Sequence, residues 1–297
     1  LRPSESASIP VVSIGNLTVG GSGKTPFSAW CTHWLSERGA RPALVTRGYG
    51  RDEVELHRRW NPSVPVICDA KRARGTESAA AEGADCVVVD DGFQHRALQR
   101  DLDVVLVAAE LGIQGRCLPR GPFRESAAAL QRADVVIVTR KQASGATVER
   151  VWAEVARRAP RALRGIVEFE GAEWVALDLC SPIDRPDVRA GGLVVCSVAR
   201  PEGVRALAAG ALGVDPTSID LRSLPDHHEY TRDDVHALVR EAAGRPVITT
   251  EKDAVKLRAF CRELPSERVH VLRLKMQWTR GEADFTARLA HIAGIQP

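Results

Sequence analysis

A glycine-rich loop followed by lysine and threonine is the group of residues in this chain best suited to bind phosphate. The loop reads Gly20-Gly21-Ser22-Gly23, and Lys24-Thr25-Pro26 follow directly. Backbone N–H groups of such a loop bind phosphate oxygens, the lysine reaches the outer phosphates, and the threonine hydroxyl can hold Mg²⁺. Thr18 stands where the pattern G-x-x-x-x-G-K-[ST] has its first glycine, so the loop belongs to the GGxGKT variants. The predicted nucleotide-binding residues are Gly20, Gly21, Ser22, Gly23, Lys24 and Thr25.

A pair of acids follows a second apolar run. The segment 86–95 reads CVVVDDGFQH, so Asp90 and Asp91 stand at the end of four apolar residues. In a phosphate-loop fold, an acid at the end of the neighbouring strand holds Mg²⁺ directly or through water. The alternative is an ordinary Asp-Asp-Gly turn. The position after a buried strand favours the metal site.

The elements around the glycine loop are those that a phosphate site needs. The apolar run 9–14 predicts a buried parallel strand before the loop. After the loop, apolar residues recur at i, i+3, i+4, i+7 and i+8, which places them on one face of a helix: Phe27, Trp30, Cys31, Trp34 and Leu35. A glycine turn before an ordinary helix is the alternative. The junction of strand, glycine loop and helix favours nucleotide binding.

Further strands are expected through the first half of the chain. They are short and rich in valine and isoleucine, at residues 43–46, 64–68, 86–89, 104–108 and 135–139. Continuous apolar strands of this kind are typical of a parallel sheet covered on both faces. Helices are expected at 72–82 and 125–132. The pattern predicts an α/β fold with a P-loop kinase-type doubly wound, mostly parallel sheet whose functional loops lie at the carboxyl ends of the strands.

A second, smaller α/β domain is expected after residue 164. A helix at 146–164 closes the first domain, and residues 165–178 alternate as an antiparallel or linker strand would. A hinge rich in proline and glycine follows at 181–192, and the later strands are expected at 193–198, 246–249 and 269–274. We therefore predict domains 1–164 and 165–297.

Composition narrows the class of protein. Of 297 residues, 44% are hydrophobic and 27% are charged, which is typical of a folded globular chain rather than a disordered one. The net charge of +3 does not indicate a nucleic-acid-binding protein. Seven scattered cysteines, with no C-x-x-C spacing, predict buried free thiols in a reducing compartment and no zinc site. No signal peptide and no apolar run long enough to span a bilayer is visible in the sequence.

Six sequence blocks occur in an order that resembles one enzyme family. They are GNLTVGGSGKTP (15–26), TRGYG (46–50), DDGFQH (90–95), LPRGPFRE (118–125), LPDHHEY (224–230) and TEKDAVKL (250–257). Together, from residue 9 to about residue 278, they resemble the tetraacyldisaccharide 4'-kinase family. The resemblance implies transfer of the γ-phosphoryl group of ATP to the 4'-hydroxyl of a tetraacylated glucosamine disaccharide 1-phosphate, in lipid A biosynthesis.

The resemblance also implies roles for residues around the phosphates. Arg47 of TRGYG is expected near the phosphates, although an exposed arginine on a glycine turn is the alternative. Gln94 and Arg124 are expected to contact ATP. The metal shell is expected to comprise Thr25, Asp90, Asp91 and Glu125.

The catalytic group implied by the resemblance is Asp52, His227, Lys24 and Asp90. Asp52 corresponds to an aspartate that helps to deprotonate the sugar hydroxyl, with Asp69 as the second choice. A solvated Asp-Glu pair on a loop is the alternative. His227, the first histidine of the DHH block, is expected to partner Asp52, and either member of such a pair can accept the proton. Lys252 is expected to face the cleft and to contact the phosphate already present on the lipid.

Two further expectations concern partners and rivals. The acylated disaccharide implies work at the cytoplasmic face of the inner membrane, with the enzyme cytoplasmic and peripheral, and no obligate protein partner is predicted. Members of the family carry an N-terminal membrane helix. Residues before Ile9 do not show such a helix, so attachment to the membrane by loops is kept as an alternative.

The rival functions are a P-loop ATPase switch of the GGxGKT class controlled by a protein partner, and an ATP-dependent carboxylate ligase.

Overall fold

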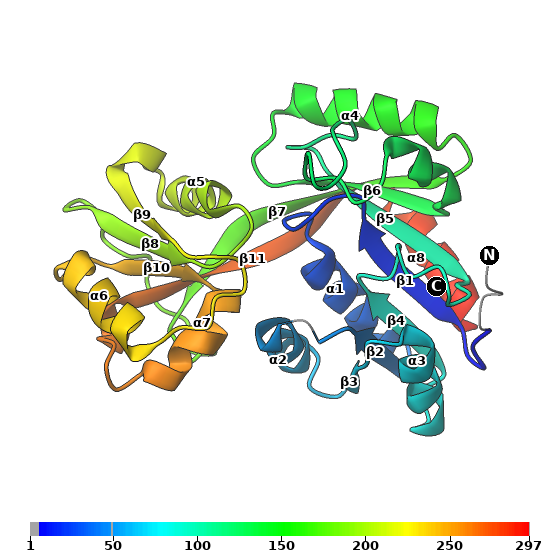
Figure 1. The fold of residues 1–297 in the computed structure, drawn as a ribbon, viewed down its shortest axis with the longest axis horizontal. Helices are drawn as coiled ribbons and strands as arrows, with labels where there is room; N and C mark the ends of the chain where they lie inside the picture. Colours follow the sequence, from blue (N-terminus) through cyan, green and yellow to red (C-terminus); the bar gives the residue numbers. More distant parts are fainter. Residues whose placement is uncertain (1–5, 49, 297) are drawn as a thin grey trace. The chain divides into compact units, whose positions relative to one another are not determined.

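Two compact units make up the chain. In the computed structural model, residues 6–48 and 50–296 are described. One unit is Leu1–Glu168 with Met276–Pro297, and the other is Phe169–Lys275. Strands β7 (Leu163–Val175) and β11 (Val269–Arg280) have residues in both units (Figure 1). The predicted division into 1–164 and 165–297 differs from this at the carboxyl end, because the last stretch of the chain returns to the first unit.

A parallel sheet forms the first unit. Its strand order is β3-β2-β4-β1-β5-β6-β7, and each neighbouring pair is parallel. The bounds not yet given are β1 (Val11–Asn16), β2 (Pro42–Thr46), β3 (Val66–Cys68), β4 (Cys86–Asp90), β5 (Leu102–Ala108) and β6 (Val135–Arg140). The predicted parallel sheet is confirmed.

Six helical segments accompany this sheet within the described residues: α1 (Lys24–Glu37), α2 (Arg51–Trp60), α3 (Arg72–Ala81), the 3₁₀ helix η1 (Ala127–Arg132), α4 (Gly145–Arg158) and α8 (Glu282–Ala293). Successive strand residues point to opposite faces of a sheet. Val11 and Val87 pack in a cluster with Ala79 of α3, yet their neighbours Val12 and Val88 are also fully buried. Both faces are therefore covered, as a doubly wound sheet requires.

Three local expectations differ from the structure. The segment after TRGYG is helix α2 rather than a loop. The expected helix at 125–132 is only the short η1, and α4 ends at Arg158, before the predicted 164. Strand β7, in contrast, agrees with the expected antiparallel or linker strand at 165–178. It pairs with β6 in parallel, and on its other side it runs antiparallel to β11, with Gly165 beside Arg280 and Ile166 beside Thr279. Its residues belong to both units.

An aromatic cluster joins the carboxyl end of the chain to the phosphate-loop helix. The ring of Phe27 in α1 lies 5.8 Å from that of Trp278 in β11 and 5.5 Å from that of Phe285 in α8. Trp30 lies 5.5 Å from Trp278 on the same side. Buried aromatic rings contribute large apolar areas to packing. This contact explains why the chain beyond Lys275 belongs to the first unit.

The second unit is built on parallel strands that belong to the same eleven-stranded sheet. Its strands β8 (Gly192–Cys196), β9 (Ile219–Ser223) and β10 (Val247–Thr250) pair in the order β11-β10-β8-β9. Its helices are α5 (Pro201–Leu212), α6 (Arg232–Ala242) and α7 (Glu251–Leu257), with 3₁₀ turns η2 (Pro216–Ser218), η3 (Arg258–Phe260) and η4 (Ser266–Arg268). Val194 packs with Ala208 of α5, and Val195 packs with Leu238 of α6, so helices cover both faces.

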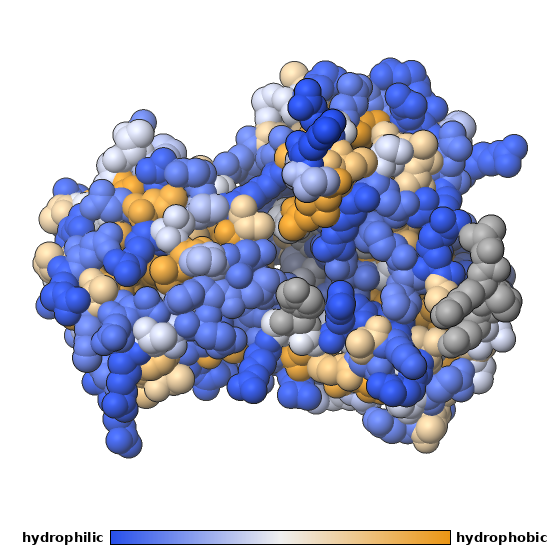
Figure 2. Space-filling view, in the orientation of Figure 1, coloured by the Kyte–Doolittle hydropathy of each residue, from blue (hydrophilic) through white to orange (hydrophobic). Residues whose placement is uncertain are grey.

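The cysteine thiols are divided between the core and the surface. All seven cysteines are free, but only Cys31, Cys86 and Cys196 are buried, so the expectation of buried thiols is wrong for the other four. Within residues 6–48 and 50–296, no helix has the length and apolar character to cross a bilayer. Figure 2 shows a mainly hydrophilic face on which apolar residues form small, scattered groups.

Candidate active site

The phosphate loop connects β1 to α1. Gly20, Gly21 and Gly23 have φ values of 63°, 70° and 83°. This left-handed region favours glycine, because a Cβ atom clashes with the backbone there. Helix α1 begins at Lys24, directly after the loop, so its N-terminal N–H groups face the loop. The geometry is that of an anion-binding turn.

Side chains from two strand ends hold the loop in place. Asn16 donates from Nδ2 to the Ser22 hydroxyl at 2.7 Å. Thr139, at the end of β6, donates to the Ser22 carbonyl at 3.0 Å, and the Lys141 ammonium donates to the Gly21 carbonyl at 3.2 Å. Thr139 is 1% exposed, so its bond is shielded from water. The loop is therefore braced before any ligand binds.

Asp90 ends β4 and is almost fully buried. It is 3% exposed, and its Oδ1 accepts a hydrogen bond from the Ser28 hydroxyl at 3.1 Å. Its Oδ2 lies 3.1 Å from Nε2 of His57, which belongs to α2. Neither Ser28 nor His57 was among the site residues predicted from the sequence. For Ser28 a signal existed, because it follows Lys24 by one turn of α1.

Asp91 lies beside two cations. Its carboxylate is 3.5 Å from the Lys24 ammonium, and Arg124 Nη1 donates to its two oxygens at 2.7 and 2.8 Å. Burial acts to raise the pKa of Asp91, but the charges of Lys24 and Arg124 outweigh it and hold this pKa below its ordinary value. Asp91 is thus kept ionised beside the phosphate loop.

Gln94 and Glu125 extend the same hydrogen-bonded group. Gln94 donates from Nε2 to the Asn16 carbonyl at 2.9 Å and to Glu125 Oε1 at 3.2 Å. Arg132 forms an ion pair with Glu125 at 3.0 Å, and this pair lowers the pKa of Glu125 against the opposing effect of burial. The first unit therefore brings together most predicted nucleotide and metal residues: Lys24, Asp90, Asp91, Gln94, Arg124 and Glu125.

The loop that carries Arg124 is attached to the exit of β1. The Arg124 N–H donates to the Leu17 carbonyl at 2.6 Å, and the Val19 N–H donates to the Pro122 carbonyl at 2.8 Å. Because these backbone bonds fix the loop against the start of the phosphate loop, Arg124 is positioned through its main chain as well as through Asp91.

Asp52 lies in the first turn of α2 and is 2% exposed. Its Oδ1 accepts the Glu53 N–H at 2.9 Å. The interpretation of Asp52 as a solvated loop residue is therefore wrong. Asp69, the second choice, accepts hydrogen bonds from the Arg74 side chain, which lower the pKa of Asp69, and from the Lys71 N–H. Asp52 thus remains the stronger choice for a proton acceptor.

Arg72 is a buried cation that was not predicted from the sequence. It opens α3, is 3% exposed, and donates from Nη1 to the Asp69 carbonyl at 2.7 Å. Burial lowers the pKa of Arg72, while the charges of Asp91 and Asp90 act in the opposite direction. The guanidinium is thus electrostatically coupled to both acids. In the sequence, the run Lys-Arg-Ala-Arg gave no sign that one arginine is buried.

In the second unit, the two histidines of the DHH block have different hydrogen-bond partners. His228 Nε2 lies 2.9 Å from Asp234, the acid of the capping box whose N-cap residue is Thr231 at the start of α6. His227 has a positive φ of 59°, donates its N–H to the Ser197 carbonyl at 3.2 Å, and lies 3.2 Å from the Lys252 ammonium through Nε2. His228 therefore belongs to the helix cap, whereas His227 belongs to a polar group with Lys252 and Asp226, whose carboxylate lies 3.3 Å from the Lys252 ammonium.

A buried carboxylate supports the His227 loop. Asp253 is fully buried, and its Oδ1 accepts the Ser197 N–H at 2.8 Å and the Tyr230 hydroxyl at 3.0 Å. Its Oδ2 accepts the Thr250 hydroxyl at 2.7 Å. Because Ser197 in turn binds the His227 backbone, Asp253 fixes the loop through two successive hydrogen bonds.

The predicted catalytic pair is divided between the units. Asp52 lies in the first unit and His227 in the second. Their partnership therefore stays a prediction, whereas the nucleotide group is complete within the first unit.

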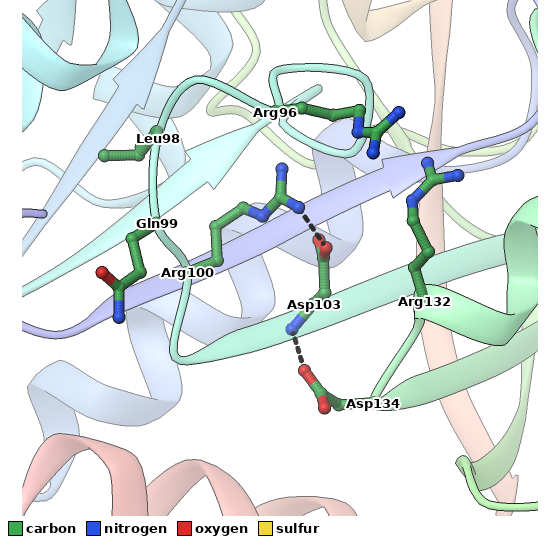
Figure 3. A pocket seen from close by; sticks show the side chains of 7 residues that line it. All are labelled: Arg96, Leu98, Gln99, Arg100, Asp103, Arg132 and Asp134. Carbon is green, nitrogen blue, oxygen red and sulfur yellow. Dashed lines mark hydrogen bonds and ion pairs between the residues drawn. The ribbon is translucent and has the colours of Figure 1, made fainter. Parts of the chain in front are cut away.

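A separate hollow of about 360 Å³ lies at the amino ends of β5 and β6, away from the carboxyl end of β1 (Figure 3). Arg100 forms an ion pair with Asp103 at 2.9 Å inside it, and Asp134 accepts the Asp103 N–H at 2.8 Å. Burial raises the pKa of Asp103 to about 6. These contacts join strand ends, so we assign the hollow a structural role.

Comparison with known proteins identifies the family. The family model described as tetraacyldisaccharide-1-P 4'-kinase matches residues 1–63 and 52–293. A tetraacyldisaccharide 4'-kinase from Anaeromyxobacter dehalogenans (strain 2CP-C) is 38% identical over 98% of this chain and 83% of its own length. A second, from Xanthomonas campestris pv. campestris (strain 8004), is 33% identical over 86% of this chain and 76% of its own length. This chain belongs to the tetraacyldisaccharide 4'-kinase family.

The fold of the family is also present. LpxK from Aquifex aeolicus, crystallised in complex with ATP, superimposes with a TM-score of 0.69 at 24% identity, covering 98% of this chain and 90% of that one. Members of the tetraacyldisaccharide 4'-kinase family are phosphotransferases that act on a hydroxyl group. The predicted family, fold and enzyme class are therefore confirmed, and the rival functions are not favoured.

Proposed function

We propose that the protein transfers the γ-phosphoryl group of ATP to the 4'-hydroxyl of a tetraacylated glucosamine disaccharide 1-phosphate. The observation that carries this proposal is the hydrogen-bonded group at the exit of β1, in which Lys24 and Arg124 converge on Asp91. Most of the rate of a phosphoryl transfer comes from positioning and from neutralising charge. The relatives named above carry this activity in their names.

ATP binding is assigned to the braced phosphate loop. The N–H groups around Gly21–Gly23 bind the β- and γ-phosphates, and Lys24 neutralises their charge. Lys24 and Arg124 both contact Asp91, so two cations are gathered beside the loop that we assign to the nucleotide. Arg124 and Gln94 then contact the nucleotide.

The side chains present fit Mg²⁺. This ion usually takes one or two carboxylates together with waters and phosphate oxygens, rather than a cage of protein ligands. Within the described residues, no group of three or more His, Cys, Asp or Glu side chains converges on one point. Each Asp90 oxygen has one hydrogen-bond donor and therefore retains a lone pair. Thr25, Asp90 and Asp91 would hold the ion, with Glu125 behind them; when bound, it neutralises charge on the transferring phosphoryl group.

Proton removal is assigned to Asp52 and His227. Asp52 is buried, which keeps water from competing for its carboxylate. We assign Asp52 as the acceptor of the 4'-hydroxyl proton and His227 as its partner, and general base catalysis of this kind contributes about 10² to 10⁴-fold. The second unit also supplies Lys252, whose ammonium is suited to the 1-phosphate of the disaccharide.

Peripheral attachment to the cytoplasmic face of the inner membrane belongs to the same proposal. Two large apolar side chains, Val19 and Leu118, are 40% and 56% exposed. Both residues lie beside the segment 122–123, because the Val19 N–H donates to the Pro122 carbonyl and the Leu118 N–H donates to the Phe123 carbonyl, each at 2.8 Å. Arg116 and Arg120 are exposed on either side of Leu118. An apolar tip between cations suits an anionic lipid surface.

The test is direct. The protein is incubated with ATP, Mg²⁺ and the tetraacylated disaccharide 1-phosphate, and the products are examined by mass spectrometry. A product that carries a second phosphate at the 4'-position supports the proposal. ATP hydrolysis that needs no lipid, together with nucleotide-dependent dimerisation, would instead indicate the ATPase switch.

A further inference from the structure

His57 is a buried histidine that the activity described so far does not use. It lies in α2, is 1% exposed, and its Nε2 is 3.1 Å from Asp90 Oδ2. Its other ring nitrogen, Nδ1, is buried and has no hydrogen-bond partner within residues 6–48 and 50–296. The imidazole of His57 is therefore directed at the Asp90 carboxylate.

The direction of the hydrogen bond follows from the chemistry of the two groups. An ionised carboxylate only accepts, so the proton of the shared hydrogen bond is on His57 Nε2. Ser28 donates to the other oxygen of Asp90 at 3.1 Å. Two donors from different helices, α1 and α2, therefore hold the two carboxylate oxygens and prevent the carboxylate from rotating.

The same helix carries Asp52. Residues Asp52 and His57 are five positions apart in α2, a separation of about 7.5 Å along a helix axis. The bond from His57 to Asp90 therefore attaches the helix of the assigned proton acceptor to the strand end of the assigned metal ligand. A displacement of α2 would move Asp52 and release Asp90 together.

We propose that His57 is a positioning residue for phosphoryl transfer: it holds the Asp90 carboxylate in the orientation in which the other oxygen accepts from Ser28, and it fixes α2 relative to β4. This inference rests on the proposed function, which gives Asp90 and Asp52 their roles. The alternative is that His57 only packs α2 against the sheet, since its ring also meets Trp60 edge-on at 6.1 Å.

The test compares three substitutions in the full chain. His57→Gln keeps an N–H donor at nearly the reach of Nε2, His57→Asn carries a donor that is too short, and His57→Leu has none. For each we would measure kcat, KM for ATP, and the dissociation constant of ATP with and without Mg²⁺. Circular dichroism and thermal unfolding report whether each variant is folded.

We expect His57→Leu and His57→Asn to lower kcat by about 10 to 100-fold, the usual effect of removing a group that orients a metal ligand. The gain in ATP affinity on adding Mg²⁺ is expected to shrink, while the affinity for ATP alone is unchanged because the Gly20–Thr25 loop is intact. His57→Gln is expected to recover kcat to within about 5-fold of the wild type, because it restores the donor.

Leu56→Ala is the matched control. Leu56 is buried beside His57 in α2 and does not contact Asp90 in any hydrogen bond. It is expected to lower the melting temperature and to leave the Mg²⁺ effect on ATP binding unchanged. If Leu56→Ala shifts the Mg²⁺ effect as much as His57→Leu does, or if His57→Leu leaves kcat and the Mg²⁺ effect at wild-type values, the positioning role is wrong. If the wild-type protein itself transfers no phosphate, the proposed function and this inference are both wrong. If the wild type is active and only the His57 variants behave unexpectedly, the inference alone is wrong.

Discussion

Arg124 Nη1 lies 2.7 and 2.8 Å from the two carboxylate oxygens of Asp91. The residue that we assign to the nucleotide is therefore bound directly to a residue that we assign to the metal. Lys24 approaches the same carboxylate at 3.5 Å. Asp91 thus acts as a counter-ion that holds the side chains of Lys24 and Arg124 together beside the phosphate loop.

Removal of Arg124 is expected to weaken ATP binding and to shift the pH profile. Arg124→Gln loses a charge-assisted hydrogen bond, so KM for ATP should rise about 10-fold or more. Arg124 helps to hold the pKa of Asp91 low. Without it this pKa rises, and because Asp91 acts as an anion, activity on the acid side should be lost at a higher pH than in the wild type. Initial rates across pH would show this, and Arg124→Lys, which keeps the charge, should show a smaller shift.

Lys24 and Asp52 are expected to differ in the size of their effects. Lys24→Ala removes a cation from the developing charge of the transferring group and should lower kcat/KM by about 10³-fold or more. Asp52→Asn removes only proton transfer and should lower kcat by about 10²-fold with little change in KM for ATP. Steady-state kinetics with the lipid acceptor measures both. A Lys24→Ala enzyme with near-normal activity would refute the phosphate-loop assignment.

Asp253→Ala is expected to destabilise the second unit and to slow transfer without affecting ATP binding. The substitution leaves the Ser197, Tyr230 and Thr250 donors buried without their acceptor and should lower the free energy of unfolding by about 3 kcal/mol or more. Because the loop of His227 loses its support, kcat should fall. Nucleotide titration should give the wild-type dissociation constant.

The control for Asp253 is Asp187→Asn, which breaks an exposed ion pair with Arg189. Such surface changes usually alter the free energy of unfolding by less than about 0.5 kcal/mol. Equal effects of the two substitutions on kcat would contradict the role of Asp253 at His227.

Asp103 is expected to make the stability of the protein depend on pH. Burial raises the pKa of Asp103 from 3.8 to about 6, in spite of the opposing charge of Arg100. A group whose folded-state pKa is raised stabilises the fold at low pH, and this contribution is lost as pH rises through the folded pKa. The free energy of unfolding of the wild type, relative to Asp103→Asn, should therefore fall by about 2 kcal/mol between pH 4 and pH 7. Urea titrations of both proteins at several pH values measure it, and a difference that does not change with pH would show that Asp103 is not protonated in this range.

Leu118→Asp is expected to weaken membrane attachment. The substitution removes the exposed apolar tip and introduces a negative charge between Arg116 and Arg120. Co-sedimentation with vesicles that contain anionic phospholipid should decrease several-fold, while ATP binding should be unchanged. Leu163→Asp, at another exposed apolar residue, serves as the control. Equal loss in the two variants would argue against the Leu118 loop as the attachment site.

The phosphate loop, the acids at the end of β4 and the parallel sheet could all be predicted from the order of the residues. These features depend on residues that are adjacent or at regular spacing, such as Gly23-Lys24-Thr25 and Asp90-Asp91, so the local pattern carries the information. Family blocks placed Gln94, Arg124 and Glu125, and the structure brings them together.

The residues that surround these groups could not be predicted from the sequence, because they are brought together by the fold. His57 and Asp90 are 33 positions apart, and their contact depends on how α2 packs against the sheet. Arg72 resembles a surface charge in the sequence, yet it is buried beside the acids. The return of the last residues to the first unit depends on Phe27 meeting Phe285 across the fold. Such contacts arise from long-range packing of apolar surface, which local periodicity does not encode.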